Sequence, residues 1–311
     1  MGKKSVQFLF YFITSVILFS CGPKDYHDNL EFTKSDNGAP VNEAQITNPF
    51  LATPASTISR VTVGIVANYN EKKSSYFGLC SGVKLNSTTI LTAAHCVSTM
   101  DTIRIVYGKS VSSAIKNKDI YEVQNILIHT SYLNPNLRAE KRFFDIALIR
   151  LKNPLPNYEN DLDIMAQFNL LTTTQYTHLR SGSGDDASSE ALRLGPMIAG
   201  YGFAFQRTTS LSQDNKTVGV LNEAPVQLNL SDYTDRIIKV GADEISQACV
   251  GDSGGPLYIW RDDKYYVQGI AISVKDTDKS DPFASSICDK QSYYLNLDFF
   301  ADWIKTSSES L

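Results

Sequence analysis

The sequence lacks several features that would indicate a membrane-embedded, nucleic-acid-binding or metal-dependent protein. Its longest nearly unbroken apolar stretch, Val6 to Phe19, has 14 residues, fewer than the ~20 that span a bilayer as a helix. There is no excess of positive charge, because the formal net charge is −4, so no nucleic-acid partner is indicated. No pair of histidines or cysteines has the spacing of metal ligands, so no metal and no other cofactor is expected.

Helical patterns of 10–15 residues are also missing between the apolar runs. The 311 residues are 42% hydrophobic and 20% charged, which is ordinary globular composition. Short runs rich in Val, Ile and Tyr alternate with turn residues at intervals near ten, which predicts an all-β barrel or sandwich. A C-terminal helix is predicted from Leu297 to about residue 307 by apolar residues at spacings of three and four. The runs predicted as strands include Val61–Asn68, Thr89–Thr92, Ile103–Tyr107, Ile120–Ile128, Ile146–Leu151, Met197–Tyr201, Pro256–Trp260, Tyr265–Ser273 and Tyr293–Leu297.

The N-terminus predicts export. Lys3 and Lys4 precede the 14-residue apolar stretch, as in a signal peptide covering residues 1–20. The following LFSC, ending at Cys21, resembles a bacterial lipobox, in which the cysteine is lipidated after the signal is cut. The alternative is ordinary cleavage nearby, which leaves Cys21 as a free thiol. We therefore expect an exported lipoprotein attached to a membrane, with residues 21–45 as a polar tether or propeptide and one folded domain at 46–311.

The cysteine count agrees with export. There are five cysteines, and an exported protein meets an oxidising compartment in which an odd cysteine needs an explanation. Lipidation of Cys21 would leave an even set of four. Chain order suggests the pairs Cys80–Cys96 and Cys249–Cys288, although four cysteines permit three connectivities.

Three segments contain residues suited to nucleophilic catalysis. His95 ends the run Thr88–Cys96, in which two small residues before the ring leave room for a rigidly packed general base. Ser253 has glycines on both sides, so the N–H groups of Gly251 and Ser253 can converge on a developing oxyanion. Asp145 opens a strongly apolar strand, where a buried acid needs a specific hydrogen-bonding partner. The alternative for Asp145 is a surface aspartate that precedes a strand.

These segments resemble the three signature blocks of the trypsin/chymotrypsin family of serine peptidases. The blocks are TAAHC at Thr92–Cys96, DIAL at Asp145–Leu148 and GDSGGP at Gly251–Pro256, in the family's order and with their key residues 50 and 108 positions apart. Weaker matches extend the resemblance over roughly residues 46–307 and include Cys80-Ser81-Gly82 for the family's Cys-Gly-Gly, Gly200-Tyr201-Gly202 for its Gly-Trp-Gly, Gly269–Ser273 for its substrate-binding strand and Asp302-Trp303-Ile304 in its terminal helix.

The resemblance implies a fold and a mechanism. The fold is two packed six-stranded antiparallel β-barrels, at about 46–165 and 166–297, followed by the C-terminal helix at about 297–307. His95 is then the general base, Asp145 orients its ring and Ser253 forms the acyl-enzyme with peptide substrates. Ser273 is expected to hydrogen-bond Asp145 from behind.

Two other functions compete with this interpretation. The segment around Ser253 also fits the G-x-S-x-G elbow of α/β-hydrolases, but that family needs a catalytic histidine after the serine. No histidine follows His178, so the lipase or esterase alternative fails. The second alternative is an inactive, binding-only member of the peptidase family, although all three triad residues are present here.

The family's activation mechanism implies a role for Asp252. In the family, an activating protease creates a new N-terminal Ile or Val whose ammonium pairs with the aspartate before the nucleophile. Ile46 has about the right distance ahead of the first strand, although this sequence departs from the family's Arg/Ile-Val-Gly-Gly junction. Arg60-Val61 has more familiar cleavage chemistry but lies too close to Cys80. We therefore expect cleavage before Ile46.

The specificity pocket differs from that of trypsin. Gln247, six residues before the nucleophile, occupies the position at the base of the family's pocket, where trypsin-like enzymes have aspartate. A neutral amide cannot pair with a buried Arg or Lys charge, so no strong preference for basic residues is expected. Lys275 near the rim would favour acidic groups. The remaining predicted lining residues indicate a mixed pocket of moderate size: Ala248, Val250, Ser273, Val274 and Ser292.

Overall fold

The fold was obtained from a computed structural model of the chain. The structure describes residues 50–51, 57–156, 196–202, 204–205, 216–226, 228–229, 235–240, 248–261, 264–275 and 291–311. The predicted signal peptide, the tether with Cys21, and the residues Ile46, Gln247 and Cys288 lie outside these ranges.

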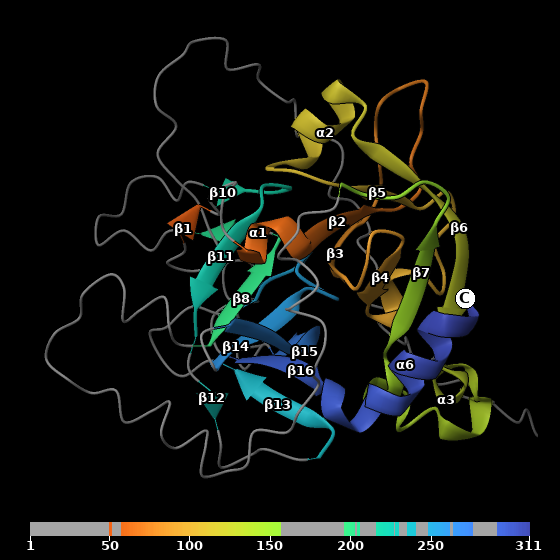
Figure 1. Ribbon diagram of the computed structural model, residues 1–311, viewed down its shortest axis with the longest axis vertical. Coiled ribbons are helices and arrows are strands. Elements are labelled where there is room, and N and C mark those ends of the chain that lie inside the picture. Colours follow the sequence, from red (N-terminus) through yellow and green to blue (C-terminus); the bar gives the residue numbers. More distant parts are fainter. Residues whose placement is uncertain are drawn as a thin grey trace, which may run out of the picture. The chain divides into compact units, whose positions relative to one another are not determined.

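The first half of the fold is a closed antiparallel barrel of six strands (Figure 1). Apolar side chains from every strand fill its interior, and those of Ile65, Ile90, Leu91, Ile105 and Leu148 are almost completely buried. In the order in which they pair, the strands are β2 (Thr62–Val66), β3 (Leu79–Lys84), β4 (Thr89–Thr92), β7 (Ala147–Leu151), β6 (Ile120–Ile128) and β5 (Arg104–Val106).

The second half is an antiparallel sheet with eight strands in the described residues. Six of these strands have four or more residues, and β1 and β12 have two each. The short strand β1 belongs to this sheet through its pairing with β11, although the predicted boundary placed residues from 46 onward in the first barrel. The strands follow the order β1 (Phe50–Leu51), β11 (Asn222–Pro225), β8 (Met197–Gly200), β14 (Pro256–Arg261), β15 (Lys264–Lys275), β16 (Gln291–Asn296), β13 (Ile237–Val240) and β12 (Leu228–Asn229).

Short elements connect the strands. Helix α2 (Val111–Asn117) was not predicted, because its two turns are too short to show a helical period. It is capped at one end by the Ser110 hydroxyl and at the other by Lys118 in the left-handed conformation. The other short elements are α1 (Thr57–Val61), η1 (Ala94–Cys96), α3 (Thr130–Leu133), η2 (Pro135–Leu137), η3 (Lys141–Phe144), β9 (Ala204–Phe205) and β10 (Lys216–Thr217).

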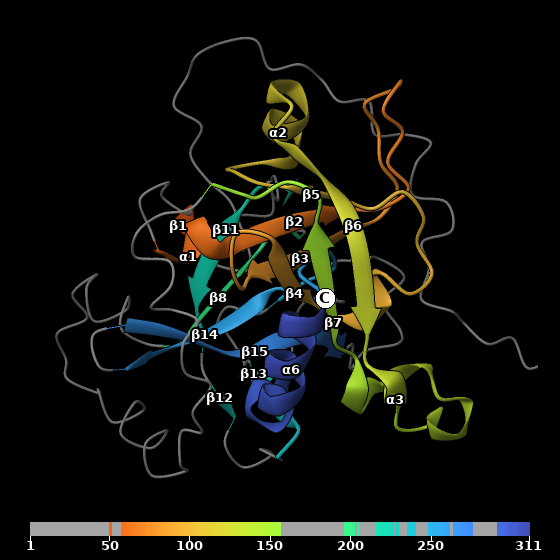
Figure 2. The same cartoon turned by 45° about the vertical axis from the view of Figure 1, so that its right-hand side comes forward.

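The chain ends in the predicted helix, which forms as the 3-10 turn η7 (Leu297–Phe300) followed by α6 (Ala301–Ser310). Helix α6 packs beside β7 of the first barrel (Figure 2). Ile304 of α6 is buried in the same apolar cluster as Leu148 and Ile149 of β7. The Arg150 guanidinium on β7 donates to the Ser308 carbonyl at 3.2 Å. No helix in the described ranges is long and apolar enough to cross a membrane.

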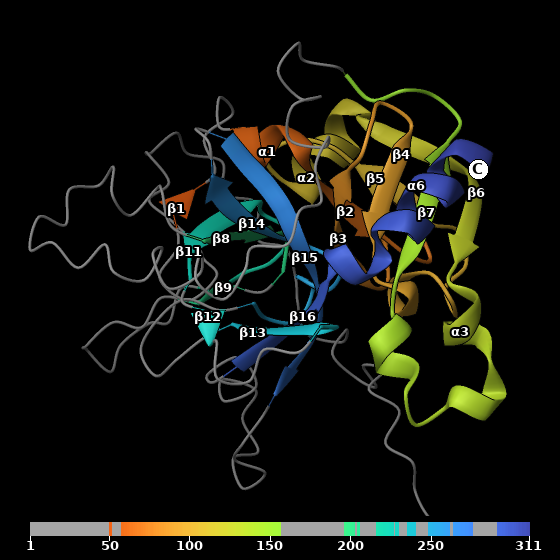
Figure 3. The ribbon, with the colours of Figure 1, turned by 60° about the horizontal axis from the view of Figure 1, so that its bottom comes forward.

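Strand β3 connects the two sheets. It contacts β14 and β8 of the second sheet (Figure 3), and its Ser81 N–H donates to the carbonyl of Ser253 at 2.8 Å. On the neighbouring strand, the Thr62 hydroxyl lies 3.1 Å from the hydroxyl of buried Tyr258. The Ser81–Ser253 bond holds the segment before β14 against β3, and Cys80 of β3 is disulfide-bonded to Cys96, the residue after His95.

Candidate active site

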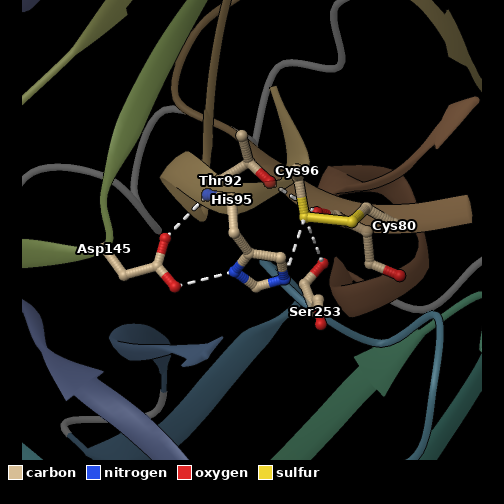
Figure 4. A network of polar contacts seen from close by, with 7 residues as sticks. Cys80, Thr92, His95, Cys96, Asp145 and Ser253 are labelled. Carbon is tan, nitrogen blue, oxygen red and sulfur yellow. Dashed lines mark hydrogen bonds and ion pairs between the residues drawn. A yellow bond between two sulfur atoms is a disulfide. The ribbon is translucent and has the colours of Figure 1, made fainter. Parts of the chain in front are cut away.

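Two paired strands bring His95 and Asp145 together. Thr92, the last residue of β4, pairs with Ala147, the first residue of β7. His95 follows β4 in the short turn η1, and Asp145 precedes β7 at the end of η3. Both oxygens of the Asp145 carboxylate are used, since Oδ1 accepts the His95 backbone N–H at 2.8 Å and Oδ2 lies 2.7 Å from ring Nδ1 (Figure 4).

The burial of this pair determines the tautomer of the imidazole. The Asp145 side chain is 8% exposed, whereas that of His95 is 36% exposed. A buried carboxylate needs a donor, so Nδ1 carries the proton and Nε2 keeps its lone pair when the ring is neutral. The exposed edge of the ring therefore presents a base.

Ser253 follows a tight turn that requires glycine. The N–H of Asp252 donates to the Cys249 carbonyl at 3.0 Å, and Gly251, third in the turn, has φ +97°. This combination is that of a type II turn, which places a residue with positive φ at its third position. Gly254 has φ +78°, and a Cβ there would lie 2.0 Å from Thr92 Oγ1. Gly251 is therefore needed to form the turn, and Gly254 is needed for the turn to pack closely against the first barrel.

His95 and Ser253 lie side by side against one disulfide (Figure 4). Cys96 Sγ is 3.7 Å from His95 Nε2 and 3.5 Å from the Ser253 carbonyl oxygen. An oxidised sulfur has no proton to donate, so both are packing contacts. Within the described part of the chain, Ser253 Oγ and His95 Nε2 are not joined by a hydrogen bond. Such bonds are often long in substrate-free sites and shorten when substrate binds.

The predicted oxyanion donors are free to bind a ligand. Within the described residues, the N–H groups of Gly251 and Ser253 donate to no protein acceptor, whereas those of Asp252, Gly254 and Gly255 are all bonded internally. Two unused N–H groups in one turn can both reach a single oxygen atom.

The Cys80–Cys96 disulfide forms as chain order suggested, with Cα atoms 6.1 Å apart. Cys249 is also disulfide-bonded, and its predicted partner Cys288 lies outside the described residues. Cys80, His95 and Cys96 are the one group of metal-ligating residue types found close together in the described ranges. Their two sulfurs are bonded to each other, which removes the thiolates that a metal would need.

Asp252 points away from His95 and Asp145 and into the protein. Its side chain is buried, with Oδ1 accepting the Gly202 N–H and Oδ2 the Cys249 N–H, each at 2.8 Å. Burial raises the pKa of this carboxyl to about 7, and the two N–H donors offset only part of that effect. No cation contacts the carboxyl group within the described part of the chain.

The described residues of the predicted pocket differ in burial. Ala248 and Ser292 are buried, and the Ala248 N–H donates to Ser292 Oγ at 2.9 Å. Ser292 in turn pairs with half-buried Val274 across β15 and β16. Val250 is 50% exposed. Ser273 is exposed and, contrary to the expectation, makes no hydrogen bond to Asp145 in this structure. Lys275 is the last residue of β15.

One residue in contact with the site was missed. Ser81 was noted only as a departure from the family's Cys-Gly-Gly, yet its side chain is completely buried against Gly251. The substituted glycine was the available signal, because a hydroxyl introduced into a buried position needs a partner.

Comparisons with known proteins agree with the class of protein that this architecture defines. The fold is the chymotrypsin-like arrangement of two antiparallel β-domains: a solved structure titled HL collagenase covers 85% of this chain and 99% of its own at a TM-score of 0.52 and 16% identity. The sequence model of the trypsin family matches residues 54–304. The chain belongs to the trypsin family.

Curated relatives are distant, and the matches cover most of both chains. Chymotrypsin-like elastase family member 1 of Rattus norvegicus is 24% identical over 241 residues, which are 74% of this chain and 79% of the relative. The protein of that name from Bos taurus is 24% identical over 244 residues, which are 76% and 81% of the two chains.

Proposed function

We propose that the protein is an active serine endopeptidase with Ser253 as nucleophile, His95 as general base and Asp145 as its orienting acid. The observation that carries the proposal is the His95 Nδ1–Asp145 Oδ2 contact of 2.7 Å beside the glycine-bounded turn of Ser253. Membership of the trypsin family supports the same chemistry. A binding-only protein would have no need for a histidine held in one tautomer.

The proposed reaction proceeds through an acyl-enzyme. His95 Nε2 takes the Ser253 proton as Oγ attacks the peptide carbonyl, and the Gly251 and Ser253 N–H groups stabilise the resulting oxyanion. The imidazolium, stabilised by Asp145, then protonates the departing amine as the C–N bond breaks. Water attacks the ester by the same route in reverse, which restores the free hydroxyl and the neutral ring.

A covalent label tests the proposal directly. A fluorophosphonate should modify Ser253 of the processed enzyme and of no other residue, as read by peptide mass spectrometry, and the labelled enzyme should no longer cleave casein. If the processed protein remained unlabelled and did not cleave casein, the binding-only alternative would replace the proposal.

We also propose activation by cleavage before Ile46. The nearest described strand, β1, starts four residues later and pairs with β11, which pairs with β8. Strand β8 leads directly to Gly202, whose N–H binds Asp252. The segment from Ile46 to β1 can span about 13 Å when extended. Asp252 is buried without a cation in the described residues, so a new ammonium group would neutralise a costly charge. N-terminal sequencing of active enzyme that began elsewhere would overturn the site.

The raised pKa of Asp252 predicts a pH-dependent precursor. Between about pH 4 and pH 7 the folded precursor keeps a proton that the unfolded chain has lost, so its stability falls as pH rises, by about 4 kcal/mol in total. Urea unfolding of the Ser253→Ala precursor at several pH values measures this slope. Adding Asp252→Asn should flatten it, and an equal slope in both proteins would contradict the prediction. In the cleaved enzyme the new ammonium group should lower the pKa of Asp252, so that stability no longer falls as the pH rises.

The proposed specificity excludes a strong preference for Arg or Lys at the cleavage site, because Gln247 is neutral. The buried contact between Ala248 and Ser292, two uncharged residues, supports this expectation, as do relatives named chymotrypsin-like elastases. A peptide-library cleavage profile dominated by Arg or Lys would show that these positions are assigned to the wrong pocket residues.

Export and lipid attachment at Cys21 are proposed from the sequence alone. Metabolic labelling with a fatty acid should mark the full chain in its membrane fraction, and Cys21→Ser should remove the label. Label that persisted in the variant would place the lipid elsewhere.

A further inference from the structure

Ser81 lies where the two sheets meet, in strand β3. Its side chain is completely buried, and it replaces the first glycine of the family's Cys-Gly-Gly block. The neighbouring Cys80 forms the disulfide with Cys96, so this stretch of strand is linked covalently to the residue that follows His95.

Ser81 binds both ends of the nucleophile turn. Its backbone N–H donates to the carbonyl of Ser253 at 2.8 Å. Its hydroxyl donates to the carbonyl of Gly251 at 3.0 Å. One residue of the first barrel thus holds the first and last carbonyl groups of the tripeptide Gly251–Ser253, whose N–H groups are the proposed oxyanion donors.

The direction of this hydrogen-bond chain is fixed. The backbone N–H of Tyr201 donates to Ser81 Oγ at 2.9 Å, and an N–H can only donate. The Gly251 carbonyl can only accept, so the Ser81 proton must point toward Gly251. The next amide along the chain, that of Gly202, donates to Asp252 at 2.8 Å. Two consecutive N–H groups therefore support the same turn, one of them through Ser81.

Tyr201 itself is held firmly. Its ring is completely buried, and its hydroxyl donates to the Gly108 carbonyl at 2.6 Å. The ring packs in a cluster with Val106 and with Val111 of α2. The support for the nucleophile turn therefore extends from the β5–α2 connection through Tyr201 to Ser81 and Gly251.

We propose that Ser81 is a positioning residue: its hydroxyl holds the Gly251 carbonyl so that the N–H groups of Gly251 and Ser253 face the substrate oxyanion. This rests on the proposed function. Glycine at the third position of a type II turn permits the adjoining peptide planes to rotate at little steric cost. A bond to the glycine's own carbonyl resists that rotation. Removing the hydroxyl also leaves the Tyr201 N–H and the Gly251 carbonyl without their buried partner.

The test removes the hydroxyl in two ways, Ser81→Ala and Ser81→Gly, the second restoring the family's residue in case the first folds poorly. Loss of one complete oxyanion donor costs about 10²–10³ in kcat, so loosening a donor should lower kcat by about 10–100-fold with KM nearly unchanged. Affinity for a peptide boronic acid, which places a tetrahedral oxygen in the same site, should fall by the same factor. Enzyme concentrations are set by fluorophosphonate titration after processing of the full chain.

Thr62→Val is the matched control. Thr62 is also completely buried, and its hydroxyl donates to the Ile58 carbonyl at 2.8 Å and contacts Tyr258. Its loss should lower the melting temperature but leave kcat and boronic-acid affinity within about twofold of wild type, since it touches no residue of the turn. Ser81 variants with kcat and boronic-acid affinity as close to wild type as the control's would overturn the proposal.

Hydrogen exchange separates this proposal from the proposed function. Amides of residues 249–255 should exchange at least tenfold faster in both Ser81 variants than in wild type and Thr62→Val. If wild type failed to react with fluorophosphonate, the proposed function would fail, while faster exchange would still assign the turn's support to Ser81. Unchanged exchange in these amides would overturn the role of Ser81 whether or not the enzyme is active.

Discussion

Ser253→Ala is expected to lower kcat for peptide substrates by about 10⁶ and to leave the folded protein intact. The expected loss is large because, in the proposed mechanism, this hydroxyl forms the covalent bond of the acyl-enzyme. Folding should be unaffected, because Ser253 contacts the rest of the protein through its carbonyl, which accepts from the Ser81 N–H. Its side chain is half-buried and makes no hydrogen bond within the described residues.

Casein and peptide-amide hydrolysis by processed wild type and variant measure this effect, with melting temperature as the check on folding. Ser112→Ala, an exposed serine on α2, is the matched control and should retain full activity. Residual activity of more than about one part in 10³ would mean that another nucleophile acts. Collapse of the fold on the same substitution would make Ser253 a structural residue.

Most strands of the first barrel could be predicted because they carry short runs of Val, Ile and Leu between turn residues, although β3 (Leu79–Lys84) was not among the predicted strands. Thr89–Thr92 and Ile120–Ile128 have the predicted bounds, and the paired ends of β4 and β7 explain why His95 and Asp145 meet although 50 residues separate them. The contact between His95 and Asp145 could therefore be predicted from the sequence blocks and their order along the chain.

Contacts that depend on tertiary context could not be predicted. Strand β1 has only two residues, too few for any periodicity, and its place in the second sheet is determined by pairing with Asn222 and Glu223. The hydroxyl of Ser81 gains its role from Tyr201 and Gly251, which lie 120 and 170 residues away. The bond from Ser273 to Asp145 was expected from the resemblance alone. In the structure Ser273 is exposed on β15 and does not make it.

Asp145→Asn is expected to lower kcat by about 10⁴, because the amide forces His95 into the wrong tautomer. The backbone N–H of His95 donates to Oδ1, so the amide oxygen must occupy that position. The NH₂ group then faces ring Nδ1, which must accept and so loses its proton to Nε2. An imidazole protonated at Nε2 cannot take the proton of Ser253. The opposite amide orientation would instead place two donors, NH₂ and the backbone N–H, against each other.

The rate loss should appear in kcat with KM little changed, since Asp145 is buried beneath the ring and makes no contact that substrate could replace. Proton NMR supplies a second readout: wild type should show a strongly downfield Nδ1–H signal from His95, and the variant should lack it. Asp101→Asn, the same substitution at an exposed position, should change neither. A variant with kcat within tenfold of wild type would show that Asp145 does not set the tautomer, and the acid that orients His95 would have to be sought elsewhere in the chain.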